Sequence, residues 1–174
     1  MASYYLDTDV VGGDGSGSSW ANAFASLSAA ESYLTSNNIT EASTLYCRGT
    51  AADTTAVTIN GTGADTYRLT IQGDRTNQTT FSTSHYRLSV TTSAVLIIAD
   101  ALVTVNDVQL LMGNTDTYYG GFVSQGQQAT AAAHIYNRCI ANGNAGRGFL
   151  FNVVSVTTAG STVNYNNCIS YNLK

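Results

Sequence analysis

The chain has 174 residues, a length that fits one domain of ordinary size better than two. Hydrophobic residues make up 44% of it, which excludes a disordered tail, and only 10% of the residues are charged, so the surface must be built mainly from Ser, Thr, Asn, Gln and Gly. Eleven acidic and seven basic residues give a net charge of -4 without a basic cluster, so nucleic acid and anionic membrane are poor partners.

Residues 1–41 are expected to form an N-terminal strand, a Gly-rich turn and a capping helix, and residues 42–174 to complete the same domain. Apolar side chains at spacings of three and four predict one helix over about residues 19–36. These apolar positions are Trp20, Phe24, Leu27, Ala30 and Leu34. The Gly-rich residues 12–19 before them lack the lysine of a phosphate loop, and their final serines are expected to cap the helix.

Short β-type runs separated by Gly, Asn, Asp and Thr follow from about residue 42. The predicted strands are residues 44–47, 56–59, 68–72, 87–90, 95–98 and 103–105. Such a series fits a β-sandwich, but internal repeats favour another fold.

The repeats align three pairs of segments. Tyr136–Asn142 returns as Tyr165–Tyr171 after 29 residues, and Asn106–Leu110 aligns with Asn137–Ala141 after 31. Gly49 aligns with Gly73, at a separation of 24. Repeats of this length with two or three short strands each predict an all-β fold, a right-handed parallel β-helix (solenoid) with an N-terminal capping α-helix.

Stacking of the repeats would place equivalent side chains in columns. Val108, Cys139 and Cys168 are expected to form one interior column, and the recurring Asn at the bend before it is expected to form a side-chain ladder. The three cysteines, which include Cys47, lie far apart and contain no Cys-x-x-Cys pair. Neither a disulfide framework nor a zinc site is predicted, and buried thiols are the expected state.

Five segments carry a family resemblance: Tyr4–Asp7, Gly12–Phe24, Thr70–Asp74, Thr83–Leu88 and Asn167–Asn172. The first two resemble the N-terminal cap, and the others the repeats, of the right-handed parallel β-helix proteins of the pectin-lyase-like superfamily. The chain is closest to the phage virion and tailspike-type members. The resemblance implies the fold more than the function, because that superfamily includes polysaccharide lyases and hydrolases as well as virion proteins.

Three aspartates are the candidate acidic site: Asp74, Asp100 and Asp107. A glycosidase needs two carboxyls about 5 to 10 Å apart, and calcium needs about six to eight oxygens. Aspartate at a turn explains each residue more simply. His85 and His134 lie in no recognisable nucleophile motif. No catalytic residue, metal or cofactor is therefore predicted.

Tyrosine is the more suggestive residue type, with 11 copies. Its large apolar ring and polar hydroxyl suit a protein interface or stacking against a sugar. The predicted interface or ligand contacts are Tyr118, Tyr119, Tyr165 and Tyr171.

These features favour a non-catalytic structural virion protein, such as a phage capsid decoration protein or a head or tail fibre component. The expected partners are copies of the same chain, with a homotrimer preferred from the resemblance, and viral capsid or tail proteins. Met1 leads into Ala2–Asp7 without a secretion signal, so the expected location is the virion, after synthesis in a host cytoplasm. The alternatives are an extracellular polysaccharide-acting enzyme (a lyase or glycosidase) or its N-terminal portion, or a carbohydrate-binding β-helix module.

Overall fold

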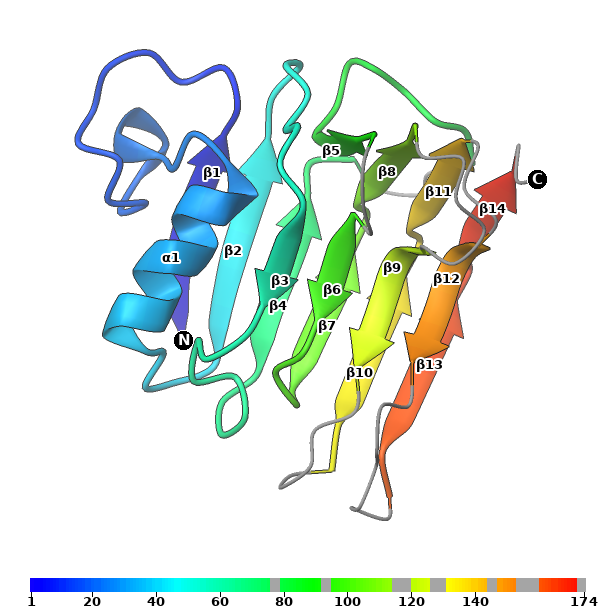
Figure 1. The fold of residues 1–174 in the computed structure, drawn as a ribbon. Helices are drawn as coiled ribbons and strands as arrows, with labels where there is room; N and C mark the ends of the chain where they lie inside the picture. The colour runs from blue at the N-terminus through cyan, green and yellow to red at the C-terminus, as the bar shows by residue number, and fades with distance from the viewer. Residues whose placement is uncertain are drawn as a thin grey trace.

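The computed structural model describes most of the chain. The described residues are 1–75, 79–91, 95–113, 120–125, 131–143, 147–152 and 160–171. Over these residues the chain forms three parallel sheets and one α-helix (Figure 1).

We call the sheets A, B and C. Sheet A has the strand order β1 (Ala2–Asp7), β2 (Ser43–Arg48), β4 (Leu69–Gly73), β7 (Val103–Asn106), β10 (Ala133–Asn137) and β13 (Thr162–Asn166). Sheet B has the order β5 (Arg87–Val90), β8 (Gln109–Met112), β11 (Ile140–Gly143) and β14 (Ile169–Tyr171). Sheet C has the order β3 (Val57–Ile59), β6 (Leu96–Ile98), β9 (Gly120–Gln125) and β12 (Arg147–Asn152).

From β4 onward the chain visits sheets A, B and C in rotation, and we call one such passage a circuit. Strands β4–β6, β7–β9 and β10–β12 form complete circuits, and β13 and β14 begin the next. The parallel pairing follows the sequence repeats: Tyr136 pairs with Tyr165, and Asn106 pairs with Asn137. These two alignments are confirmed. The alignment of Gly49 with Gly73 is wrong by two residues, because Gly73 pairs with Cys47.

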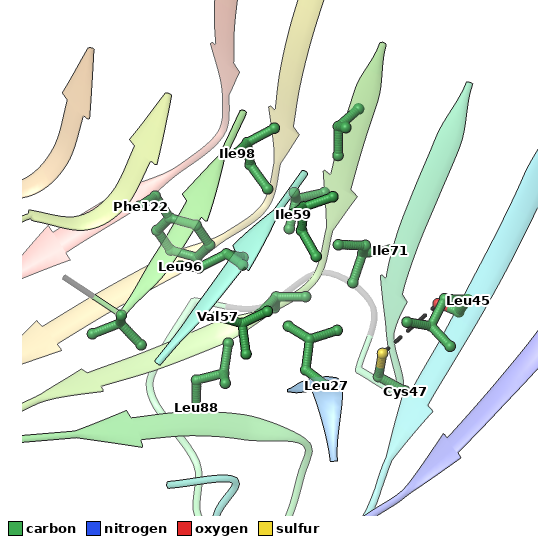
Figure 2. Packing of buried hydrophobic residues seen from close by; sticks show 14 of the residues in the cluster. Leu27, Leu45, Cys47, Val57, Ile59, Ile71, Leu88, Leu96, Ile98 and Phe122 are labelled. Carbon is green, nitrogen blue, oxygen red and sulfur yellow. Dashed lines mark hydrogen bonds between the residues drawn. The ribbon is translucent and has the colours of Figure 1, made fainter. Parts of the chain in front are cut away.

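The core lies between the three sheets and the helix. Alternating burial along β2 and β4 places one side chain in two inside. Figure 2 shows Leu45, Ile71, Ile59, Leu96 and Phe122 from five different strands in one cluster. Because all three sheets contribute to the same cluster, the described residues share a continuous hydrophobic core.

The helix begins later than the sequence pattern predicts. Residues Trp20–Asn22 form one 3-10 turn (η1), and the α-helix α1 covers Leu27–Asn37. Phe24, predicted to be helical, is extended because its backbone binds β1: its N–H donates to the Tyr5 carbonyl, and its own carbonyl accepts from Asp7 N–H, both at 2.9 Å. Ser26 Oγ then accepts from Ala29 N–H at 3.1 Å and caps α1.

The predicted fold class is also wrong. The described residues form a mixed α/β structure with one α-helix and three separate parallel sheets, and they do not form a closed solenoid. The helix is part of the core: Leu27, Ala30 and Leu34 are buried in the same cluster as the strand residues. The prediction treated the helix as a cap on an all-β fold, whereas its apolar face belongs to the common core.

Candidate functional site

Asp100 holds two segments of the chain together. It lies between β6 and β7 and is buried. Its carboxylate accepts from Gly61 N–H at 2.6 Å, and from the N–H and hydroxyl of Thr62 at 2.9 and 2.5 Å. These three bonds supply the hydrogen-bond partners that a buried carboxylate needs. Asp100 is therefore occupied by the internal structure.

Asp107 occupies the bend between β7 and β8, and its side chain is fully buried. Arg138 holds it in a bidentate ion pair, with Nε to Oδ1 at 2.8 Å and Nη2 to Oδ2 at 2.6 Å. Gln72 Nε2 donates to the same Oδ2 at 3.0 Å. The pair raises the pKa of the Arg138 guanidinium, chiefly through the hydrogen bonds to Asp107.

Asp74 follows β4 and is the most accessible of the three aspartates, with 25% of its side chain exposed. Its Oδ1 accepts from Tyr86 N–H at 3.0 Å and lies 3.6 Å from His85 Nδ1. Because β4 and β7 are neighbours, Asp74 and Asp107 lie at the same end of sheet A, whereas Asp100 lies before β7 at the opposite end. The structure therefore does not gather the three candidates. In the part of the chain that is described, no group of three or more His, Cys, Asp or Glu residues is arranged to hold a metal ion.

The two histidines differ in environment. His85 is only partly buried, whereas His134 on β10 is fully buried. His134 Nε2 lies 2.8 Å from the Asp100 carbonyl oxygen, and Nδ1 has no hydrogen-bond partner among the described residues. Burial, together with the nearby Arg68, lowers the pKa of His134. His134 is thus held neutral in the core.

The tyrosines predicted as contacts are only partly described. Tyr118 and Tyr119 lie outside the described residues. Tyr171 is half-buried, and its hydroxyl accepts from Phe81 N–H at 2.9 Å. Tyr165 on β13 is 39% exposed and stacks on the buried Tyr136, with ring centroids 5.1 Å apart. The structure therefore places both described contacts on edge strands, Tyr165 on β13 of sheet A and Tyr171 on β14 of sheet B.

At the end of the molecule that contains α1, other segments cover the edges of all three sheets. Residues 17–24 bind the edge of β1, through Tyr5 N–H to Gly17 O and the two bonds of Phe24. Helix α1 packs beside β3. Asp53 bridges to β5 through its backbone. Its carbonyl oxygen accepts from Ser89 N–H at 2.7 Å, and its N–H donates to Arg87 O at 3.0 Å. Covered edges of this kind protect a sheet from pairing with other chains.

The opposite end of sheet A is different. Strand β13 pairs with β10 on one side, and on its other side it has no partner strand among the described residues. We call this side of β13 the open edge (Figure 1). Tyr136 is fully buried, whereas its partner Tyr165 is exposed. Ile140 is fully buried, whereas its partner Ile169 is half-buried. Strands β13 and β14 thus expose residue types that the preceding circuit buries.

An asparagine ladder leads to this edge. Asn106 Nδ2 donates to Gln72 at 3.1 Å, Asn137 to Asn106 at 2.8 Å, and Asn166 to Asn137 at 2.8 Å. The ladder predicted from the repeats is confirmed. The residue after each of the three asparagines, which is Asp107, Arg138 or Asn167, has a left-handed backbone with φ of 53 to 55°.

Two features of the site were missed by the sequence analysis. The alignment of Asn106–Leu110 with Asn137–Ala141 places Asp107 opposite Arg138 on the next circuit, so the ion pair could have been inferred from it. The state of Cys168 had no such signal: it is half-buried, whereas Cys139 is buried, although both were predicted to lie inside. The predicted column of Val108, Cys139 and Cys168 is nevertheless in register, because Gln109, Ile140 and Ile169 pair in succession.

Comparison of the chain with protein-family models, with curated proteins and with solved structures finds no match. The pectin-lyase-like resemblance therefore has no support from these comparisons. Among the described residues, no helix has the length and apolar character needed to cross a membrane.

Proposed function

We propose that this protein is a non-catalytic structural component of a virus particle, either a capsid decoration protein or a head or tail fibre component, and that it assembles through the open edge of β13. The observation that carries the proposal is the difference between the two ends of the molecule. Three segments cover the sheet edges at the α1 end, whereas β13 presents its edge without a described partner.

The hydrogen-bonding groups of β13 alternate in direction. Thr162 N–H donates to Ala132 O at 2.7 Å, and Asn166 O accepts from Arg138 N–H at 2.8 Å, so residues 162, 164 and 166 direct their backbone groups towards β10. In a parallel ladder the intervening residues face the other way. Val163 therefore directs its backbone groups away from β10, where a partner strand would meet them.

The composition of the open edge supports pairing with a second copy of this chain. Natural edge strands are commonly protected by charged side chains or proline. Residues 160–171 contain neither, so nothing in this segment repels an identical strand. Two identical strands that pair edge to edge are related by a twofold axis and run antiparallel, which gives a dimer. The homotrimer expected from the resemblance stays a prediction, and it would use a different surface.

The state of the carboxylates supports a role without catalysis. Asp100 and Asp107 are buried and satisfied by internal hydrogen bonds, and they lie at opposite ends of β7. A glycosidase would need a carboxyl pair facing a sugar from one side of the molecule. The burial of both residues favours a structural use of their charge.

The proposal is tested by a matched pair of proline variants in β13. Val163→Pro removes an N–H that faces the open edge, whereas Asn164→Pro removes one that faces β10. We expect wild type to sediment as a dimer and Val163→Pro as a folded monomer with nearly unchanged circular dichroism. Asn164→Pro should lose about 1 to 3 kcal/mol of stability, because a ladder acceptor is left unsatisfied.

The location is tested by tracing the chain through a density gradient of a lysate from the producing culture, with mass spectrometry of the fractions. Comigration with particles is the expected result. A wild-type monomer at high concentration, or equal self-association of wild type and Val163→Pro, would exclude the open edge as the contact. Recovery only in soluble fractions together with cleavage of a polysaccharide would overturn the structural role in favour of an enzyme.

A further inference from the structure

Cys139 and Cys168 occupy equivalent positions on neighbouring circuits. Each follows a left-handed residue, Arg138 or Asn167, at the bend between sheets A and B. Two backbone bonds fix the neighbouring segments: Arg138 N–H to Asn166 O at 2.8 Å, and Ile169 N–H to Cys139 O at 3.0 Å. Adjacent parallel strands lie about 4.8 Å apart, which is within the Cα separation that a disulfide spans, about 4.4 to 6.8 Å.

The two thiols have the same orientation. Cys139 Sγ lies 3.4 Å from Val105 O, and Cys168 Sγ lies 3.4 Å from Tyr136 O, the corresponding carbonyl of the next circuit. Both side chains therefore point back towards the preceding circuit, so the Cys168 thiol is directed towards the circuit that contains Cys139. The Cys168 thiol thus lies on the side of its strand from which a disulfide to Cys139 would form.

Their environments differ in a way that assigns them separate roles. The hydrogen bond from the Cys139 thiol, supported by nearby backbone groups, lowers the pKa of Cys168 to about 7, whereas burial raises the pKa of Cys139 well above its usual range. Cys168 is half-buried and Cys139 is buried. The more accessible sulfur is thus the better nucleophile, and the enclosed one occupies the equivalent position on the neighbouring circuit.

We propose that Cys139 and Cys168 form an oxidation site, in which Cys168 reacts with a hydroperoxide and Cys139 then closes a disulfide between the last two circuits. This inference does not rest on the proposed function. It concerns a pair of sulfurs placed by the strand register, and it holds for the chain in any assembly that leaves Cys168 accessible.

The reaction proceeds in two balanced steps. The Cys168 thiolate attacks the terminal oxygen of the hydroperoxide, the O–O bond breaks, and the alkoxide leaves as an alcohol after it takes a proton. Cys168 becomes a sulfenic acid. Cys139 sulfur then attacks Cys168 sulfur, the S–O bond breaks, and the hydroxide leaves as water with the Cys139 proton. Two electrons from the sulfur pair reduce one peroxide, and a thiol reductant reverses the change.

Cys47 provides an internal control, because it is a buried thiol in β2 that pairs with Gly73. Val108 suggests the matched variant: it occupies the position equivalent to Cys139 on the preceding circuit, so Cys139→Val places there a residue that this column already accommodates. Cys168→Ser removes the nucleophile at the more accessible position.

The test treats the full chain with an equimolar amount of hydrogen peroxide, followed by intact mass and non-reducing peptide mapping. Wild type should lose two hydrogens and yield a Cys139–Cys168 cross-linked peptide. Cys139→Val should instead accumulate a sulfenic acid at Cys168 that dimedone traps, and Cys168→Ser should consume peroxide at least tenfold more slowly. The rate for wild type should rise with pH through about 7. The same assay on Val163→Pro separates this site from the contact at the open edge.

Three results would overturn the inference. One is oxidation of Cys47 at the same rate as Cys168. Another is a Cys168 that passes to sulfinic acid in wild type without a Cys139 cross-link. The third is a disulfide that joins two chains in wild type and in Val163→Pro alike, because it would show that the partner sulfur is not Cys139 of the same chain.

Discussion

The ion pair between Asp107 and Arg138 allows a quantitative test of what holds the bend after sheet A together. The substitution is Arg138→Asn. Asn167 occupies the equivalent position on the next circuit and has nearly the same left-handed φ, 54° against 53°. The substitution therefore introduces a residue type that this backbone tolerates, and it removes the guanidinium together with part of the aliphatic side chain.

The magnitude follows from the exposure of the two partners. Removing one partner of a fully buried pair costs about 3 to 5 kcal/mol, and an exposed pair contributes about 0 to 1 kcal/mol. Here the carboxylate is fully buried but the arginine side chain is 34% exposed, so water screens part of the interaction. Gln72 still donates to Oδ2 in the variant. We expect Arg138→Asn to lower the free energy of unfolding by about 2 to 3 kcal/mol.

Urea unfolding followed by tyrosine fluorescence measures this change, and Asp107→Asn completes a double-mutant cycle. In the Arg138→Asn background, Asp107→Asn should cost much less than in wild type, because the buried charge has already lost its partner. Equal urea midpoints for Arg138→Asn and wild type would refute the reasoning. So would a cost of Asp107→Asn that is the same in both backgrounds.

Two further predictions concern the core. Because burial lowers the pKa of His134 in the folded chain, the unfolded chain binds more protons as the pH falls below about 6.5. Wild type should therefore lose stability between about pH 7.5 and 5.5. In urea titrations over this range, the stability of His134→Gln, which keeps His85, should fall less steeply with pH. Equal slopes would exclude His134 as the cause. Gly73→Ala would place a Cβ 2.1 Å from the Asp107 backbone oxygen and should cost about 1 to 3 kcal/mol, measured as a lower melting temperature. Gly113→Ala, whose nearest contact is a side-chain carbon of Thr91 at 2.7 Å, is the control and should cost less; the reverse order would contradict the packing argument.

The sequence predicted the strands and their pairing better than the fold class. Strand positions follow from period-two burial, and the register of β10 with β13 follows from the repeat of Tyr136 as Tyr165. The start of α1 could not be found from spacing, because Phe24 has the same apolar side chain whether it belongs to a helix or binds β1. Here a long-range backbone contact overrides the local helical pattern.

The candidate site was only partly predictable, for a related reason. Asp100 and Asp107 were identified as acidic residues at bends, but their partners lie more than 30 residues away in the chain. Whether a carboxylate is buried and satisfied depends on such contacts, which a local motif does not contain. The tyrosines show the same effect: Tyr136 is core and Tyr165 is exposed, although the residues around them repeat. Their difference comes from the position of each circuit in the stack.

The order of strand pairing has a kinetic consequence. In sheet A, each strand from β4 onward pairs with the strand of this sheet that precedes it in the chain. The segments that cover the sheet edges at the α1 end all come from the first 55 residues. A chain emerging from the ribosome can therefore complete its protected end first and add later circuits to an existing template. Protection of backbone amides from hydrogen exchange should accordingly decrease from β4 towards β13, with β13 and β14 opening at the lowest free energy.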